Sequence, residues 1–224
     1  MTIVSSKNCG VTHPVWPLFD LRVVTPRIEL RYVDDSSAVQ LAQLAAKGIH
    51  DPDFMPFAMP WTDARSPLLE RNSMQWFWRC RAETSPSRFH MPLAVVVDGV
   101  VAGTTSLEAH DFPILRQFES GSWLGRQFQG QGLGKELRRA TLHLGFAGFG
   151  ATLATTTAFF DNGPSLGVTR SLGYTATGVG RKVRRDVSTD SMLFEMTRDH
   201  WQQHLRADDI SIHHLDACLP LLGL

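Results

Sequence analysis

The chain has 224 residues, of which 43% are hydrophobic, and its 22 basic side chains balance its 22 acidic ones, so the formal net charge is zero. This length suits one large domain with a sizeable core, and the neutral balance argues against a polybasic nucleic-acid-binding or membrane-surface protein. Three scattered thiols, Cys9, Cys80 and Cys218, argue against a disulfide framework or a CxxC metal site. With no apolar stretch of about 18 residues and no export signal, we expect a cytoplasmic protein that neither spans nor binds a membrane.

The first predicted elements are an arm, a strand and a helix. Residues 1–24 form an irregular, partly apolar N-terminal arm that we expect to pack on the domain. Alternating Ile28, Leu30 and Tyr32 predict a strand, and Asp34 or Asp35 is placed to cap the helix that follows it.

A loop rich in proline, methionine and aromatic residues follows, at residues 50–61. Its prolines exclude a regular element, yet it is too apolar for a free loop, so we expect it to cover a core or line a pocket. Residues 66–82 then predict a helix. For its Trp76–Trp78 stripe we favour a core position over a place in the pocket wall, because aromatic stripes at helical spacing are usually buried.

The second half of the chain predicts most of a sheet. Residues 93–97 and 100–102 flank Asp98-Gly99, a pair that tolerates a type I′ turn. Further strands are expected at 120–124, 151–160, 176–185 and 191–197, with helices from the glycine-rich turn to about residue 149, at 163–172 and at 198–206. The order is mixed α+β around one sheet, which we divide into a main domain at 25–207 and an appendage at 208–224.

The segment with the clearest chemistry is Gly125–Lys135, which joins a strand to a helix and has glycines at 130, 132 and 134. Glycine lets the backbone approach a ligand, and the helix start offers unpaired N–H groups and a positive dipole end, which together suit a pyrophosphate. Lys135 is followed by Glu136 rather than by the Ser or Thr of a Walker A loop, and GxGxG is not the GxGxxG of a dinucleotide fold.

The pattern Gln129-x-x-Gly132-x-Gly134 resembles the coenzyme A loop of the GNAT superfamily of N-acyltransferases. Asp161-Asn162-Gly163-Pro164-Ser165, followed by Ser171-Leu172-Gly173-Tyr174, is similar to a second segment of that family. Thr25–Arg31, Glu119–Leu124 and the Met55–Trp61 loop resemble its RimJ/RimL branch of actinobacterial type, some members of which are described as succinyltransferases.

The resemblance implies a GNAT fold, a central twisted mixed β-sheet flanked by helices, in which acyl-CoA (acetyl-CoA or succinyl-CoA) and an amine acceptor meet without a metal. Coenzyme A would enter where the strands at 120–125 and 151–160 splay apart. It assigns coenzyme binding to Trp123, Leu124, Gly125, Arg126, Gln129, Gly130, Gln131, Gly132, Leu133, Gly134, Lys135, Asn162 and Ser165. Arg138 and Arg139 are expected either near the coenzyme's phosphates or on a solvated helix face.

The reaction that this resemblance implies needs a neutral amine and a proton for the leaving thiolate. At pH 7 a lysine amine is neutral in about one molecule in 2,500, and an α-amine in about one in seven. Many relatives use a Tyr as the proton donor, where this chain has Thr169, so Ser165 is the catalytic candidate instead. Glu119 is the candidate base, with Asp111 and Glu108 as rivals.

The predicted acceptor is a protein N-terminus or a lysine, and a small amine or antibiotic is the alternative. A third reading is a coenzyme-binding module without turnover. The predicted acceptor pocket consists of Phe54, Met55, Phe57, Trp61 and Glu119. For a succinyl donor, the cation facing its distal carboxylate is sought among Arg116, Lys182, Arg184 and Arg185.

Three further features lie outside this site. His200 and His204 have the spacing of two zinc ligands, but Trp201 stands where HExxH has its glutamate, so we expect surface histidines. The apolar ending at 219–222 is expected to dock on the core or on a second subunit of a homo-oligomer. Acids in the first third of the chain, between Asp34 and Asp63, are candidates to face the amine.

Overall fold

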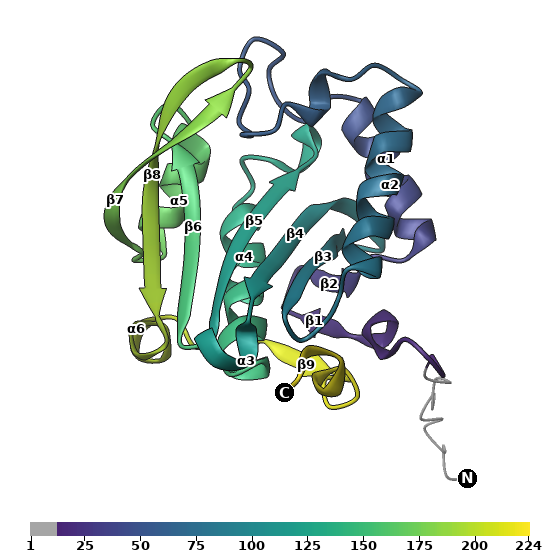
Figure 1. Cartoon of the computed structure of the whole chain (residues 1–224), viewed down its shortest axis with the longest axis vertical. Coiled ribbons are helices and arrows are strands. Elements are labelled where there is room, and N and C mark those ends of the chain that lie inside the picture. Colours follow the sequence, from purple (N-terminus) through teal and green to yellow (C-terminus); the bar gives the residue numbers. More distant parts are fainter. Residues whose placement is uncertain (1–12) are drawn as a thin grey trace, which may run out of the picture.

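The computed structural model describes residues 13–224, so Cys9 and the first half of the predicted arm lie outside the described residues. Its centre is a sheet with the strand order β7-β8-β6-β5-β4-β3-β2-β1-β9 (Figure 1). All neighbours are antiparallel except β5 and β6. The strands are β1 (Arg22–Val24), β2 (Glu29–Tyr32), β3 (Arg88–Val97), β4 (Val100–His110), β5 (Gln117–Leu124), β6 (Leu153–Phe159), β7 (Thr175–Arg184), β8 (Val187–Thr197) and β9 (Ser211–His213).

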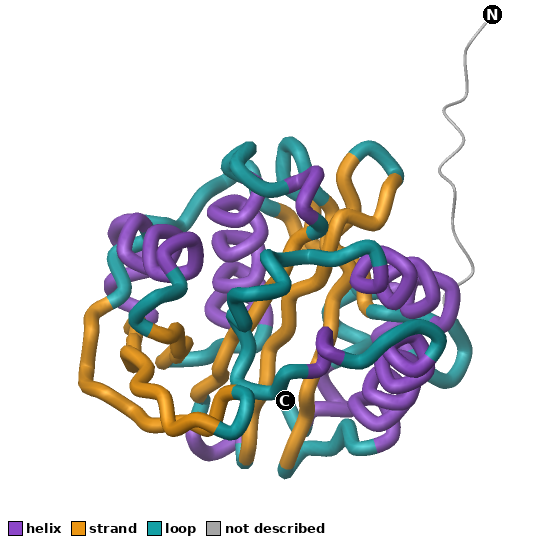
Figure 2. Tube along the Cα trace, turned by 90° about the horizontal axis from the view of Figure 1, so that it is seen from above, coloured by secondary structure: helices purple, strands orange, loops and turns teal. Residues whose placement is uncertain are grey.

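Helices cover both faces of this sheet (Figure 2). One face is covered by α1 and α2, whose Leu41 and Phe77 form a small core with Ala94 of β3. The opposite face is covered by α4, where Thr141 bonds to Thr105 of β4. The helices are α1 (Asp35–Ala46), α2 (Leu68–Ala82), α3 (Phe112–Leu115), α4 (Leu133–His143), α5 (Gly163–Ser171) and α6 (Arg198–His204). The expected mixed α+β fold, a mixed sheet flanked by helices, is therefore confirmed.

The predicted hairpin is present and longer than expected. Asp98 and Gly99 have φ of 49° and 80°, the positive values that a type I′ turn requires at both positions. The strands extend back to Arg88 and forward to His110, because β3 and β4 pair with each other over this whole length.

The helix after the glycine loop runs about as far as expected. α4 ends at His143, and one π-helical turn, Leu144–Gly148, follows it without a break. Gly145 in that turn lies against Phe118 of β5, where an added Cβ would clash with the ring. The predicted end of the helix near residue 149 is therefore confirmed, with a π-helical last turn.

Two short strands, β1 and β9, were not predicted. β1 pairs with β2 and with β9, so segments from the two ends of the described chain form one edge of the sheet. Leu18 and Leu21 before β1, and Cys218 and Leu222 after β9, are completely buried in the main core. No helix among the described residues is long and apolar enough to cross a membrane.

Candidate active site

β5 and β6 separate after a short contact, and a cavity occupies the separation. The two strands pair only from Gln117 to Glu119 on β5, after which β5 stays with β4 and β6 with β8. A cavity of about 1,330 Å³ runs through the splay and reaches both faces of the sheet.

The glycine-rich loop forms one end of this cavity. Gly130 and Gly132 have φ of 73° and 78°, a left-handed conformation that costs an L side chain free energy. Gly132 is the N-cap of α4 and supplies no side-chain cap, so the first N–H groups of the helix keep their donors for a ligand. Nothing lies within 4 Å of a Cβ built at Gly130. The loop therefore presents backbone donors to open space.

Gln129 fixes this loop to the rest of the fold. Its Nε2 donates to the carbonyl oxygens of Ile49 and Leu124, each at 2.8 Å, and so joins the end of α1, the end of β5 and the loop. Gln131 closes the turn by donating to the carbonyl of Gln127.

The predicted coenzyme residues divide into two groups by position. Those in the cavity wall are Trp123, Leu124, Gln129, Gly130, Gly132, Gly134, Lys135, Asn162 and Ser165. The other four lie outside the wall: Leu133 is buried in the core, Gly125 is buried against Leu44, and Arg126 and Gln131 are exposed on the loop.

The two arginines of α4 differ in burial, and only Arg138 departs from the expected solvated helix face. Arg138 is only 5% exposed and points into the splay, where Nη1 donates to the Ser120 carbonyl (3.3 Å), Ser120 Oγ (2.9 Å) and Thr156 Oγ1 (3.0 Å). Arg139 lies 3.8 Å from Asp209. Within residues 13–224, no carboxylate reaches Arg138 and its Nε has no partner, so a buried positive charge sits at the bottom of the splay.

The start of α5 forms the wall opposite the glycine loop. Asn162 caps the helix, because its Oδ1 accepts from the backbone N–H of Ser165 at 3.2 Å. Ser165 Oγ lies at the cavity and has no hydrogen bond within the described residues. It is therefore free to donate to a ligand, whereas Thr169, the position of the family's Tyr, is buried.

The other end of the cavity, on the α2 side, contains carboxylates. Glu119 of β5 lies directly opposite Glu108 of β4, and both line the cavity. Thr157 donates to Glu119 at 3.4 Å. Asp111, the third candidate base, caps α3 with a φ of 44° and is not part of the cavity wall. His90 of β3 lines the same end and was not singled out from the sequence.

The loop between α1 and α2 covers this end. Phe57, Trp61 and Trp123 form a row of rings with centroids 5.5 and 5.9 Å apart. Phe54, Phe57 and Trp61 line the cavity, whereas Met55 is buried beneath the loop. Within the Trp76–Trp78 stripe, Phe77 is buried in the core as expected, and Trp76 packs against that core while also lining the cavity. Trp78 is 49% exposed and donates to Asp35, so the core interpretation is wrong for Trp78.

The hairpin of β7 and β8 holds this loop through ion pairs. Arg184 makes a bidentate contact with Asp161 at 2.8 Å and also reaches the Met55 carbonyl. Arg185 makes one with Asp63. Hydrogen bonds from the arginine lower the pKa of each carboxyl group. Lys182 lines the cavity and forms no ion pair within residues 13–224.

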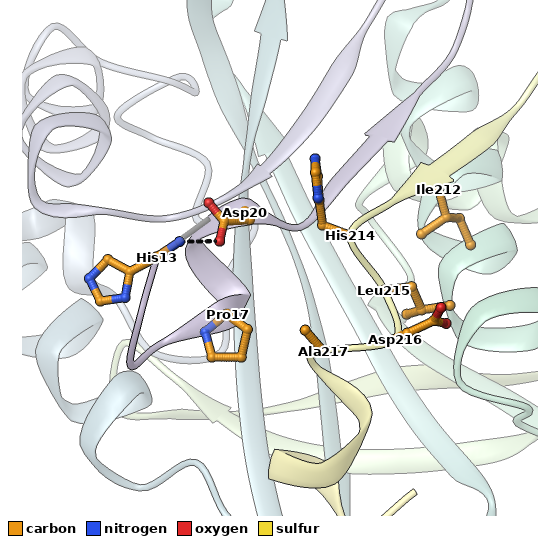
Figure 3. A pocket seen from close by; sticks show the side chains of 8 residues that line it. All are labelled: His13, Pro17, Asp20, Ile212, His214, Leu215, Asp216 and Ala217. Atoms are coloured by element: carbon orange, nitrogen blue, oxygen red, sulfur yellow. Dashed lines mark hydrogen bonds between the residues drawn. The ribbon is translucent and has the colours of Figure 1, made fainter. Parts of the chain in front are cut away.

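A second, smaller pocket of about 460 Å³ lies between the N-terminal segment and the C-terminal segment (Figure 3). His13 and Asp20 line one side, and His214 and Asp216 the other. It contains neither a glycine-rich turn nor a helix start. Across residues 13–224, no three His, Cys, Asp or Glu side chains come together as a metal site, and this includes His200 and His204.

A glycine-rich helix start at a splayed sheet, with a capped second helix opposite, is the arrangement that the sequence resemblance implied. Residues 27–175 match the family model described as the acetyltransferase (GNAT) domain. The chain belongs to the GNAT acetyltransferase family. The match includes the glycine loop, the splay and α5, so the glycine-loop end of the cavity lies inside the matched region.

Solved GNAT structures have the same fold. RimL, the ribosomal L7/L12 alpha-N-protein acetyltransferase in complex with coenzyme A, is 20% identical with a TM-score of 0.67, over 79% of this chain and 97% of that one. A GCN5-related N-acetyltransferase from Brucella melitensis is 16% identical with a TM-score of 0.67, over 81% and 80%. The microcin C7 self-immunity acetyltransferase MccE, in complex with acetyl-CoA and AMP, is 19% identical with a TM-score of 0.63, over 83% and 98%.

Proposed function

We propose that this GNAT protein is a RimJ/RimL-like enzyme that transfers an acyl group from acyl-CoA to a primary amine, namely a protein N-terminus or a lysine. The observation that carries this proposal is the continuous cavity through the splay. One end has backbone N–H donors and Lys135, which suit the phosphates of coenzyme A, and the other has Glu108 and Glu119, which suit an ammonium group.

The residues of the loop fit coenzyme A. Unpaired N–H groups at the start of α4 and two left-handed glycines, Gly130 with open space before it and Gly132 with Arg27 nearby, can bind a pyrophosphate. Beyond Glu119, the side of β5 that faces the splay has lost β6 as a partner, so its backbone is available to an extended ligand arm. Bound coenzyme A supplies the thioester, and the protein supplies position and proton transfer.

Ser165 is the proposed proton donor to the leaving thiolate. The side chain of Asn162 accepts from the backbone N–H of Ser165. The Ser165 hydroxyl has no hydrogen-bond partner in the described structure, so it can donate to the negative charge that develops on sulfur. Glu119 is the proposed base: it meets the acceptor ammonium and receives its proton. The acceptor nitrogen then attacks the thioester directly, with Phe54, Phe57 and Trp61 as the wall around it.

The acyl group is acetyl or succinyl. A succinyl donor is favoured by one observation, the buried Arg138 without a carboxylate partner at the bottom of the splay. A buried charge is costly without a counter-charge, and a distal carboxylate would supply one. Of the four cations considered from the sequence, Arg184 and Arg185 are occupied by aspartates and Arg116 lies outside the wall, whereas Lys182 lines the cavity.

A small amine or an antibiotic-like amine is the alternative acceptor, and the fold likeness to MccE supports it as much as the likeness to RimL supports a protein acceptor. A coenzyme-binding module without turnover is the non-enzymatic alternative. A cytoplasmic location and a homo-oligomer also stay predictions. Light scattering would test the homo-oligomer, because it measures the mass of the particle in solution.

Thiol release from acetyl-CoA and succinyl-CoA, measured over a panel of amines, tests the proposal. The panel contains a peptide with a free α-amine, the same peptide acetylated but carrying one lysine, and a small diamine. We expect the α-amine peptide or the lysine peptide to give the highest kcat/KM. A higher kcat/KM for the small diamine would instead support the alternative, an enzyme that acylates a small or antibiotic-like amine.

The Ser165→Ala variant tests the proposed role of Ser165 as the proton donor. Since Asn162 bonds to the backbone of residue 165 and not to its side chain, the helix start and coenzyme binding should persist. We expect kcat to fall by about 100-fold while coenzyme A still raises the melting temperature. Full turnover in Ser165→Ala would remove Ser165 from the mechanism.

A further inference from the structure

Three ionisable side chains form a row across three strands at the acceptor end of the cavity. His90 of β3 lies opposite Glu108 of β4, and Glu108 lies opposite Glu119 of β5. Directly opposed residues point to the same face with their Cβ atoms about 5 Å apart. All three line the cavity, so one row connects the proposed ammonium site with an imidazole.

The imidazole is oriented by its neighbours. Nδ1 of His90 lies 3.5 Å from Oε2 of Glu108, and the ring of Trp76 stands at 89° to the imidazole with the centroids 5.0 Å apart. Within residues 13–224, Nε2 of His90 has no hydrogen-bond partner, and the side chain is 23% exposed. An imidazole with one nitrogen beside a carboxylate and the other free has the arrangement of a general base with its orienting group.

Burial and the neighbouring charges act on His90 in opposite directions. Burial is the main cause that lowers its pKa, and Arg88 acts in the same direction, while Glu108, Glu119 and Glu83 partly oppose them. Arg79 of α2 also lines the cavity, and His110 lies 3.8 Å from Glu108. Burial thus favours the uncharged ring, and the carboxylates favour its protonated form.

Chemistry favours an imidazole over a carboxylate for the final step of this proton transfer. The acceptor ammonium has an ordinary pKa of about 8 to 10, a carboxylic acid one of about 4, and an imidazole one of about 6.5. A base works best when its pKa lies near the working pH. A carboxylate can attract the ammonium, but it holds the proton weakly.

We propose that His90, oriented by Glu108, is the final acceptor of the proton that leaves the acceptor ammonium at Glu119. The electron pair of the broken N–H bond stays on nitrogen, and the proton forms imidazolium at Nε2. The amine then forms the C–N bond as the C–S bond breaks, and the electron pair of that bond leaves on sulfur. The nitrogen loses its second proton and the thiolate gains one through Ser165, so the products are the amide and the free thiol. This inference rests on the proposed function and adds the route of the proton.

A titration of the free protein tests the His90–Glu108 pair without any turnover. NMR of the His90 ring should give a midpoint below about 6.5. In Glu108→Gln the midpoint should move to lower pH, because the carboxylate that favours imidazolium is lost. Glu83→Gln is the matched control, since Glu83 raises the pKa of His90 less. Equal midpoints in Glu108→Gln and the unmodified protein would overturn the pair.

The pH dependence of kcat/KM for thiol release then tests the proton route. In the unmodified protein, the fall of kcat/KM at acid pH should have the same midpoint as the titration of the His90 ring. In His90→Asn we expect about 100-fold lower kcat/KM at pH 7 and an acid limb moved below pH 5, where a carboxylate alone serves. An unchanged profile in His90→Asn would overturn this inference alone, whereas no thiol release by the unmodified protein would overturn the proposed function with it.

Discussion

A buried arginine illustrates how a single residue can shape this site. Where β5 and β6 separate, the Ser120 carbonyl loses its strand partner, and Arg138 and Thr156 donate to it instead. Arg138 thus satisfies a polar group that the splay would leave buried and unpaired. Arg138 is buried together with Leu137 and Thr141 of the same helix, a position that the sequence analysis did not predict.

Glu136 joins the start of α4 to the segment before β2. Its carboxylate accepts from Thr25 Oγ1 at 2.6 Å and from Arg27 Nε at 2.6 Å. Burial alone would raise the pKa of Glu136, but these hydrogen bonds outweigh it, and the net effect lowers the pKa below its usual value. The carboxylate therefore holds the coenzyme loop against the sheet.

This contact predicts a pH-dependent loss of stability in Glu136→Gln. Because the pKa is lowered in the folded state, the stabilisation is complete above the unfolded pKa of about 4.3 and disappears as the pH falls through the folded value. We expect the variant to lose about 1 to 2 kcal/mol of unfolding free energy at pH 7 and to match the unmodified protein near pH 3. Urea unfolding at both pH values measures this, and a loss of equal size at both would contradict the charge argument.

At the scale of elements, the sequence predicted the long helices and strands, but it did not predict the three-residue strands. The β3–β4 turn, α2 and the glycine loop before α4 follow from local chemistry, namely positive φ at Asp98-Gly99, helical periodicity and a helix start. β1 and β9 have three residues each, too few for an alternating pattern. They form because β1 pairs with β2 on one side and with β9 on the other.

The C-terminal segment provides the prediction at this scale. Leu222 is completely buried in the main core, whereas its neighbour Leu221 is only partly buried. Leu222→Ala should reduce the unfolding free energy by about 2 to 5 kcal/mol, and Leu221→Ala, the matched control, by clearly less. Equal losses in urea unfolding would mean that this segment does not contribute to the core as the structure has it.

At the scale of the whole molecule, the zero net charge hides a separation of charge along one cavity. Lys135 and Arg138 lie toward α4, and Glu108 and Glu119 lie toward α2. The acids expected to face the amine mostly serve other purposes: Asp34 caps α1, Asp35 pairs with Arg81, and Asp63 pairs with Arg185. The carboxylates in the cavity wall are Glu108 and Glu119, from neighbouring strands, and Asp51, the one of these expected acids that does line the cavity.

The two ends of the cavity also differ in how far the sequence could predict them. The coenzyme end is a local motif, because one loop and one helix cap carry it. The acceptor end depends on register, because His90, Glu108 and Glu119 are far apart in the chain and meet only through the pairing of β3, β4 and β5. Glu119 and Glu108 were named from the sequence, but His90 needed the sheet.

Acyl transfer itself is the central claim, and one measurement tests it most directly. The protein is incubated with acetyl-CoA or succinyl-CoA and the best amine of the panel, and free thiol and acylated amine are quantified in the same sample. We predict that thiol and acylated amine appear in equal amounts, and that neither forms when the amine is omitted. If coenzyme A raised the melting temperature but no amine yielded thiol or product, the protein would bind the coenzyme without transferring an acyl group.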